Sequence, residues 1–160
     1  MSSEAIIVER AVKADLPTVV DLCMAVEAQH EAYWALRWQR REGLPSGYLN
    51  WLTRRVDDPK MLIGVARIEG ELAGMILITI EQEVPIYTYT HYAFVQDMAT
   101  VEKFRRRGVA QKLLDFAAAW AKEQGLNQLR LLVANQNPAA RATFDAAGFR
   151  ATYQEMVRAV

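Results

Sequence analysis

The sequence predicts an α+β fold in a mixed αβα arrangement, with a central mixed, mostly antiparallel sheet flanked by helices. Three observations support this expectation. Apolar strand-like runs lie in the middle of the chain, amphipathic segments precede and follow them, and strand–helix units occupy the C-terminal third. A chain of 160 residues has the usual size of one domain, so we expect a single domain over residues 1–160.

The N-terminal half is expected to hold a strand, two helices and a hairpin. Asp15 can cap the first helix, with Pro17 tolerated in its first turn, and Ser46 can cap the second. Gly70 marks a tight turn between two apolar runs, which is typical of a β-hairpin. The expected elements are a strand at 6–11, helices at 15–30 and 46–55, and strands at 61–68 and 72–80.

The C-terminal half is expected to alternate strands with helices. Pro85 lies in a long connection that precedes the next strand. The helix after that strand has apolar residues at helical spacing and ends at Gly125, and Asn137 with Pro138 can begin the last helix. The expected elements are a strand at 91–100, a helix at 108–124, a strand at 129–134, a helix from 137 up to Gly148, and one or two short strands in 151–160.

Composition and charge argue against several classes of protein. Lysine plus arginine and aspartate plus glutamate number 19 each, so the chain lacks the positive excess that favours nucleic-acid binding. No apolar run approaches the ~18 residues of a membrane span, and the N-terminus has no signal-peptide pattern. The one cysteine, Cys23, lies on an apolar helical face, and no Cys/His cluster has metal-ligand spacing. We therefore expect a cytoplasmic protein with a buried Cys23 and without nucleic-acid, membrane or metal partners.

The segment from Arg105 to Ala110 (RRRGVA) lies between a strand-like run and the start of a long amphipathic helix. The first backbone N–H groups of a helix lack internal partners, and the helix dipole adds partial positive charge there. Gly108 lets an anion approach the backbone closely, and the arginines add forked donors. The segment therefore predicts a pyrophosphate cradle. A solvated basic turn and a basic nucleic-acid patch are the two alternative interpretations.

Residues 95–149 resemble the GCN5-related N-acetyltransferase (GNAT) superfamily in two ordered blocks. The family signature Arg/Gln-x-x-Gly-x-Gly/Ala is matched at Arg105, Gly108 and Ala110. In the second block, a strand is followed by Asn-x-x-Ala, a helix and Gly-Phe, matched at Asn137, Ala140, Gly148 and Phe149. Two blocks in the right order are more specific than one glycine motif.

The resemblance implies an N-acetyltransferase with acetyl-CoA as cosubstrate and no metal. It would transfer the acetyl group to a primary amine of a small molecule or peptide by direct attack in a ternary complex, and a homodimer is possible. A CoA-binding regulatory module without transfer activity is the alternative, and a nucleic-acid binder is a weaker third. The residues that this resemblance and the cradle assign to the cofactor are Met98, Ala99, Thr100, Arg105, Arg106, Arg107, Gly108, Val109, Ala110, Asn137, Ala140 and Phe144.

The expected catalytic residues are Met98, Gln96 and Asp97. The resemblance places a backbone N–H at Met98, or at its neighbours, where it would stabilise the thioester oxygen as negative charge develops. The family often has Glu or His where this chain has Gln96, and a tyrosine where it has Phe144. Glutamine and phenylalanine cannot titrate, so the usual acid and base are both missing.

Several other groups could take the proton of the amine: Asp97, His91, Glu27, His30 and Glu31. Strand parity separates Asp97 and His91 from the face of Gln96, unless a bulge intervenes.

The aromatic segment 33–51 is expected to pack two helices onto the sheet, or to shape the acceptor pocket. As a pocket it would hold an amine with an aromatic or anionic group, or a cation over an aromatic face. The expected substrate-binding residues are Glu27, His30 and Trp34.

Overall fold

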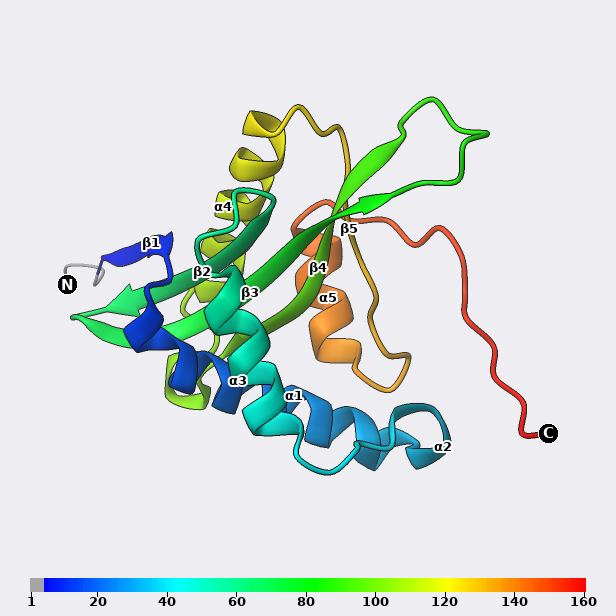
Figure 1. Ribbon diagram of the computed structural model, residues 1–160, viewed down its shortest axis with the longest axis horizontal. Coiled ribbons are helices and arrows are strands. Elements are labelled where there is room, and N and C mark those ends of the chain that lie inside the picture. Colours follow the sequence, from blue (N-terminus) through cyan, green and yellow to red (C-terminus); the bar gives the residue numbers. More distant parts are fainter. Residues whose placement is uncertain (1–4) are drawn as a thin grey trace.

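The computed structural model describes residues 5–160 and shows one five-stranded sheet between two layers of helices (Figure 1). The strands follow each other across the sheet in chain order, β1 to β5. The first four pair antiparallel, and β4 pairs with β5 in parallel, which confirms the mixed, mostly antiparallel sheet. The strands are β1 (Ile6–Arg10), β2 (Met61–Ile68), β3 (Glu71–Gln82), β4 (His91–Thr100) and β5 (Leu129–Leu131).

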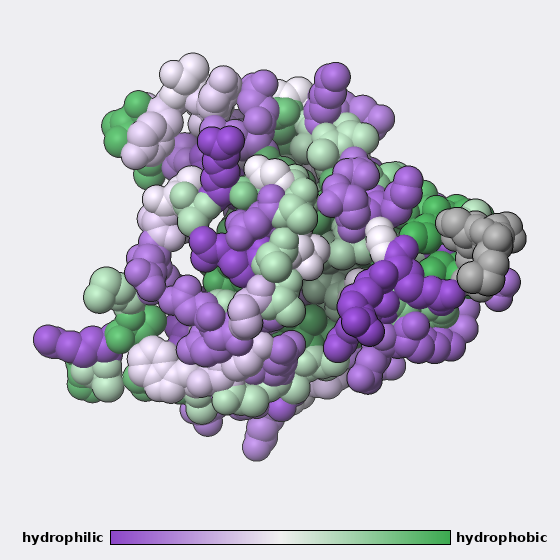
Figure 2. Space-filling model, turned by 180° about the vertical axis from the view of Figure 1, so that it is seen from behind, coloured by the Kyte–Doolittle hydropathy of each residue, from purple (hydrophilic) through white to green (hydrophobic). Residues whose placement is uncertain are grey.

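The helices divide between the two faces of the sheet. On one face lie α1 (Leu16–Tyr33), α2 (Ala35–Trp38) and α3 (Leu44–Arg55), and on the other lie α4 (Val109–Glu123) and α5 (Pro138–Ala146). Two short 3₁₀ turns, Lys13–Asp15 and Glu102–Phe104, precede α1 and follow β4. Seen from behind, hydrophilic residues cover most of the surface and hydrophobic ones form smaller groups (Figure 2). No helix within residues 5–160 has the length and apolar content needed to cross a membrane.

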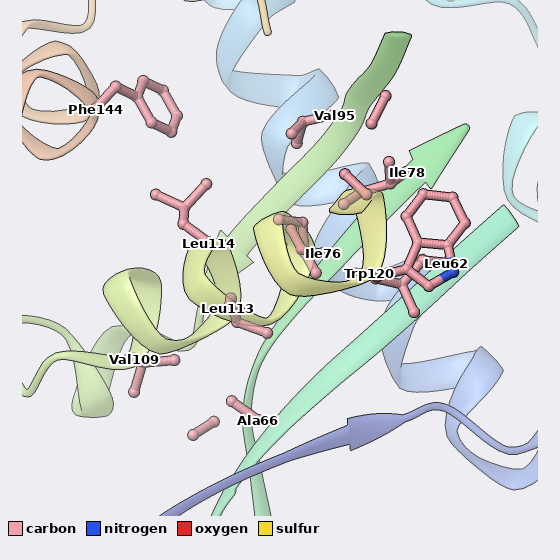
Figure 3. Close-up of a cluster of buried hydrophobic side chains, with 14 of the residues drawn as sticks. Leu62, Ala66, Ile76, Ile78, Val95, Val109, Leu113, Leu114, Trp120 and Phe144 are labelled. Atoms are coloured by element: carbon pink, nitrogen blue, oxygen red, sulfur yellow. The ribbon is translucent and has the colours of Figure 1, made fainter. Parts of the chain in front are cut away.

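Each face of the sheet carries its own hydrophobic cluster. Met75 and Leu77 of β3 face α1 and α3, whereas Ile76 and Ile78 of the same strand face α4. Figure 3 shows the cluster under α4. Because both faces are covered, β2 and β3 are nearly continuous apolar runs rather than alternating ones.

Gly74 on β3 sets how closely α4 approaches the sheet. A Cβ at this position would lie 2.8 Å from the carbonyl oxygen of Ala99 and 2.8 Å from Cγ1 of Val109. The missing side chain therefore leaves room for the first turn of α4 against β3, beside the end of β4.

The predicted strands in residues 151–160 are wrong, because this segment has no regular structure and extends away from α5 (Figure 1). A strand needs a partner edge, and β5 offers only three residues. The side chains of Tyr153 and Met156 are exposed, and Glu155 is held by Arg37 of α2 at 2.8 Å.

The helix starts also differ from the sequence-based expectations. Asp15 is the N-cap residue of α1, as expected, but its carboxylate makes no cap hydrogen bond and instead accepts from the backbone N–H of Val12 and pairs with Arg67. The second helix begins at Leu44, after Gly43 in a left-handed conformation, so Ser46 lies inside its first turn. The four-residue α2 was not expected, and β5 ends at Leu131 rather than at residue 134.

Candidate functional site

The cradle segment forms the turn between β4 and α4. Arg106 has φ 60° and Gly108 has φ 88°, so both adopt left-handed backbone conformations. Gly108 is the N-cap of α4, and the first helical amide with an internal partner is that of Lys112, which donates to the carbonyl of Gly108. The preceding N–H groups, from Val109 on, therefore point out of the helix end.

The space outside Gly108 is open. A Cβ at this position would meet only Cδ1 of Ile6, at 3.9 Å. Arg105, Arg106 and Arg107 are all exposed beside it, and the guanidinium of Arg107 lies 5.6 Å from the ring centre of Phe104. An accessible helix N-terminus with fixed positive charge beside it is suited to a phosphate group.

A gap in the sheet runs from this cradle toward the middle of β4. The pairing of β4 with β5 covers only residues 93–95 and 129–131, so the far edge of β4 has no strand partner beyond Val95. The N–H of Val101 donates to the carbonyl of Ala73 of β3. By antiparallel alternation, the amide of Ala99 also faces β3, whereas those of Met98 and Thr100 face the gap. Met98 therefore presents an N–H to any group lying in the gap.

The second sequence block lies across the gap from β4. Asn137 is the N-cap of α5, where its Oδ1 accepts from the backbone N–H of Ala140 at 3.1 Å. Phe144 is buried and packs against Phe149 with ring centres 5.9 Å apart. Figure 3 shows its ring directed from α5 toward Leu114 and Val95.

A β-bulge at Gln96 changes which side chains share a face. Leu77 pairs with Asp97 and Ile78 with Val95, so Gln96 has no counterpart on β3. The Nε2 of Gln96 donates to Oγ1 of Thr79 at 2.8 Å, and Asp97 accepts from the hydroxyl of Tyr48 in α3 at 2.5 Å. The bulge therefore places Gln96 and Asp97 together on the face covered by α1 and α3, which removes the separation expected from strand parity.

Asp97 and Cys23 are buried and lie beside the partly exposed Tyr48 and Glu27. The side chain of Asp97 is 8% exposed, and burial raises its pKa to about 6, opposed by the hydrogen bond from Tyr48 and reinforced by the charge of Glu27. Burial and the nearby negative charge of Asp97 raise the pKa values of the Cys23 thiol and the Tyr48 phenol well above their usual ranges. Near neutral pH the carboxyl titrates, while the thiol and phenol stay protonated. Cys23 is fully buried, as expected.

The raised pKa of Asp97 makes the stability of the fold depend on pH. The native carboxyl holds its proton up to about pH 6, whereas the carboxyl of the unfolded chain loses it near its ordinary pKa of 3.8. The native state therefore binds more protons in this window, so stability falls as pH rises from about 4 to 6. At about 1.4 kcal/mol per pKa unit, ionising this carboxyl costs the fold on the order of 3 kcal/mol.

A cavity of about 460 Å³ opens on the same face, next to Gln96. Tyr48 and Trp51 form part of its wall, with rings stacked 5.4 Å apart, and the guanidinium of Arg55 lies 5.5 Å from the Trp51 ring centre. Thr79 and Glu81 of β3 were not expected from the sequence. The lining residues are Tyr48, Trp51, Arg55, Asp58, Lys60, Thr79, Ile80, Glu81 and Gln96.

Three groups expected at the acceptor lie outside the lining of this cavity. Glu27 and His30 face each other at 4.0 Å on α1, and His30 also stacks on Trp38 with ring centres 5.4 Å apart. Trp34 is 42% exposed between α1 and α2.

Two further base candidates are also placed by the structure. Glu31 forms an ion pair with Arg40 at 2.7 Å, which lowers the pKa of Glu31. His91 is exposed at the start of β4, beside Thr90.

No group of three or more His, Cys, Asp or Glu side chains in residues 5–160 is arranged to hold a metal ion.

The model of the acetyltransferase (GNAT) family matches residues 21–149. The chain belongs to this family. No curated protein matches the sequence. Among solved structures, a mutant of the BH1408 protein from Bacillus halodurans has a TM-score of 0.83 and 19% identity, over 96% of this chain and 99% of that one. These matches show a GNAT fold.

Two other solved structures also resemble the chain. The aminoglycoside 6'-N-acetyltransferase AAC(6')-Ih from Acinetobacter baumannii has a TM-score of 0.74 and 18% identity, over 98% of each chain. A predicted acetyltransferase with acetyl-CoA from Clostridium acetobutylicum has a TM-score of 0.76 and 16% identity, over 96% of each chain. At these identities the likeness concerns the fold.

Two features distinguish this GNAT protein at the positions where the sequence departs from the family pattern. The amide of Gln96 is hydrogen-bonded to Thr79 and, at 3.3 Å, to Glu81. Phe144 belongs to the apolar cluster under α4 and α5. Proton transfer at either position would need another group.

Proposed function

We propose that this protein transfers an acetyl group from acetyl-CoA to a primary amine of a small molecule or peptide. The amine attacks the thioester directly in a ternary complex. The observation that carries the proposal is the uncovered edge of β4, which leads from the open N-terminus of α4 past Met98 to the bulge beside the cavity.

Each part of this path fits a part of acetyl-CoA. The amides that begin α4, with Arg105 to Arg107, would hold the pyrophosphate. The backbone of Thr100 and the side chain of Asn137 would form hydrogen bonds with the amides of the pantetheine arm. The N–H of Met98 would donate to the thioester oxygen, and one such donor is typically worth about 10²–10³ in rate. Bound acetyl-CoA supplies the activated acyl group.

The cavity beside Gln96 would hold the acceptor. Alignment of an amine with a thioester can supply roughly 7–11 kcal/mol of the barrier, which exceeds the usual share of acid–base help. A protein without a titratable group at Gln96 and Phe144 can therefore still be a transferase. The fold neighbours described as aminoglycoside N-acetyltransferases support small amines as acceptors, and the neighbour described with acetyl-CoA supports the acyl donor.

A thiol-release screen tests the proposal. The purified protein is supplied with acetyl-CoA and, separately, with amino acids, polyamines, aminosugars, arylamines and peptides with free N-termini. We expect at least one class to release CoA thiol in step with an acetylated product identified by mass spectrometry. Tight CoA binding without transfer to any class would instead support the regulatory module.

A further inference from the structure

Building on the proposed transferase function, we propose that Asp97 accepts the proton of the acceptor amine and that the hydroxyl of Tyr48 relays it. Asp97 is thereby assigned the role that Gln96 cannot fill.

The geometry brings three elements together at this point. Asp97 is paired with Leu77 and directs its side chain toward α1 and α3, and the bulge brings Gln96 to the same face. Tyr48 forms part of the cavity wall, and its hydroxyl donates to Oδ2 of Asp97. The phenol therefore connects the cavity with a carboxylate that does not itself line it. The next residue along β4 is Met98, whose N–H faces the gap, so the proton acceptor and the carbonyl donor are neighbours in the chain.

The surroundings of Asp97 favour proton acceptance over ion pairing. The titratable groups that face it are Cys23 and Glu27 from α1 and Tyr48 from α3, and none of them is a cation. Its neighbour across the strand pair is the apolar Leu77 of β3. Asp15, the other buried carboxylate within residues 5–160, is instead paired with Arg67 at 2.6 Å. Burial without a cation raises the pKa of Asp97 to about 6, close to the pH at which a general base is most effective.

In the relay, one proton passes from the amine through the hydroxyl of Tyr48 to Asp97. The neutral amine attacks the carbonyl carbon, a C–N bond forms, and the π electron pair moves to the oxygen held by the Met98 N–H. A proton leaves nitrogen for Oη of Tyr48 while the phenol proton passes to Asp97. The C–S bond then breaks, the thiolate takes a proton from solvent, and Asp97 returns its proton to solvent. Tyr48 is neutral before and after transfer, which agrees with its strongly raised pKa.

Glu81 is the competing base, because its carboxylate also lines the cavity. It accepts hydrogen bonds from Thr79 at 2.6 Å and from Gln96 at 3.3 Å. The test must therefore separate the two carboxylates.

The experiment compares pH profiles of kcat/KM in the intact protein with the best acceptor from the screen. Asp97→Asn keeps the side-chain shape and an oxygen that can accept from Tyr48, and Tyr48→Phe removes only the relaying hydroxyl. Each should lower kcat/KM by about 10²-fold or more. Each should also abolish the limb of the pH profile near pH 6 that the wild type owes to ionisation of Asp97, while CoA affinity, measured by calorimetry, stays unchanged. Glu81→Gln should retain the limb. Cys23→Ala, which disturbs the packing of the same cluster, should retain it too.

A limb that survives in both Asp97→Asn and Tyr48→Phe, or that disappears in Glu81→Gln, would overturn the relay while leaving the transferase function intact. Wild-type protein that acetylates no amine would refute the proposed function, and the relay with it.

Discussion

The cradle can be tested by adding one methyl group at Gly108. The variant Gly108→Ala places a Cβ where the structure has open space beside the first amides of α4. Two effects are expected. Any side chain at φ 88° strains the backbone, and the methyl group also occupies the surface where a pyrophosphate oxygen would lie. The first effect lowers stability, and the second lowers CoA affinity.

The two effects can be estimated separately. A non-glycine residue in the left-handed region costs about 1–2 kcal/mol, which for a domain of this size lowers the melting temperature by about 2–8 °C. A hydrogen bond to a charged group is worth about 1.5–3 kcal/mol. Displacing the phosphate from one backbone donor should therefore weaken CoA binding by roughly 10- to 150-fold.

Gly125 provides the matched control. It ends α4 with φ 74°, and a Cβ there would meet nothing within 4 Å. Gly125→Ala should show a similar loss of melting temperature by calorimetry, with unchanged CoA affinity in titrations. Equal CoA affinity in folded Gly108→Ala and wild-type protein would refute the cradle. A parallel loss of affinity in Gly125→Ala would show that strain in α4, and not contact, governs binding.

Three shorter predictions concern stability and proton supply. The melting temperature of Asp97→Asn minus that of the wild type should increase as pH rises from about 4 to 8, because only the wild type ionises a buried carboxyl. A difference that does not change with pH would contradict this. Gly74→Ala should lower the free energy of unfolding, measured in urea, by about 1–3 kcal/mol. Gly64→Ala should lower it less, because its Cβ would meet only side-chain atoms, at 3.0 Å or more. Phe144→Tyr should raise kcat without changing CoA affinity by offering the thiolate a proton; an unchanged kcat would mean that solvent already supplies it.

The sheet and the turn that begins α4 could be predicted because their signals are local. The apolar runs of β2 and β3, the turn at Gly70 and the helical spacing of α4 each depend on neighbouring residues. The same holds for Gly108, whose place between a strand and a helix determines its left-handed conformation.

The features that could not be predicted from the sequence depend on contacts between residues far apart in the chain. Nothing near Gln96 in the sequence marks a bulge, which arises from the pairing of β4 with β3. Tyr48 could be recognised only as one of several aromatic residues, since its hydroxyl meets Asp97 across 49 positions. The side chain of Asp15 suits a helix cap, but Arg67, 52 positions away, engages it instead. One or two short strands were expected in residues 151–160, but a strand needs a partner edge, and the sequence of this segment does not show whether one is free.

The bulge at Gln96 lies within a few residues of the gap, of the proposed carbonyl donor Met98 and of the proposed proton acceptor Asp97. A bulge bends its strand and increases its twist, so β4 should diverge from a straight parallel neighbour at that point. The pairing with β5 does stop at Val95, directly before the bulge. The divergence leaves the N–H of Met98 without a strand opposite, and the bulge brings Gln96 to the face on which Asp97, paired with Leu77, meets α3. A single irregularity thus accounts for the unpaired edge of β4 where we propose that the acyl donor binds, and for the position of Gln96 in the cavity that we propose for the acceptor. Deleting Gln96 would restore regular pairing with Asp97 still opposite Leu77. The deletion should therefore lower CoA affinity and keep the limb near pH 6, whereas Gln96→Ala should leave the bulge and both properties in place.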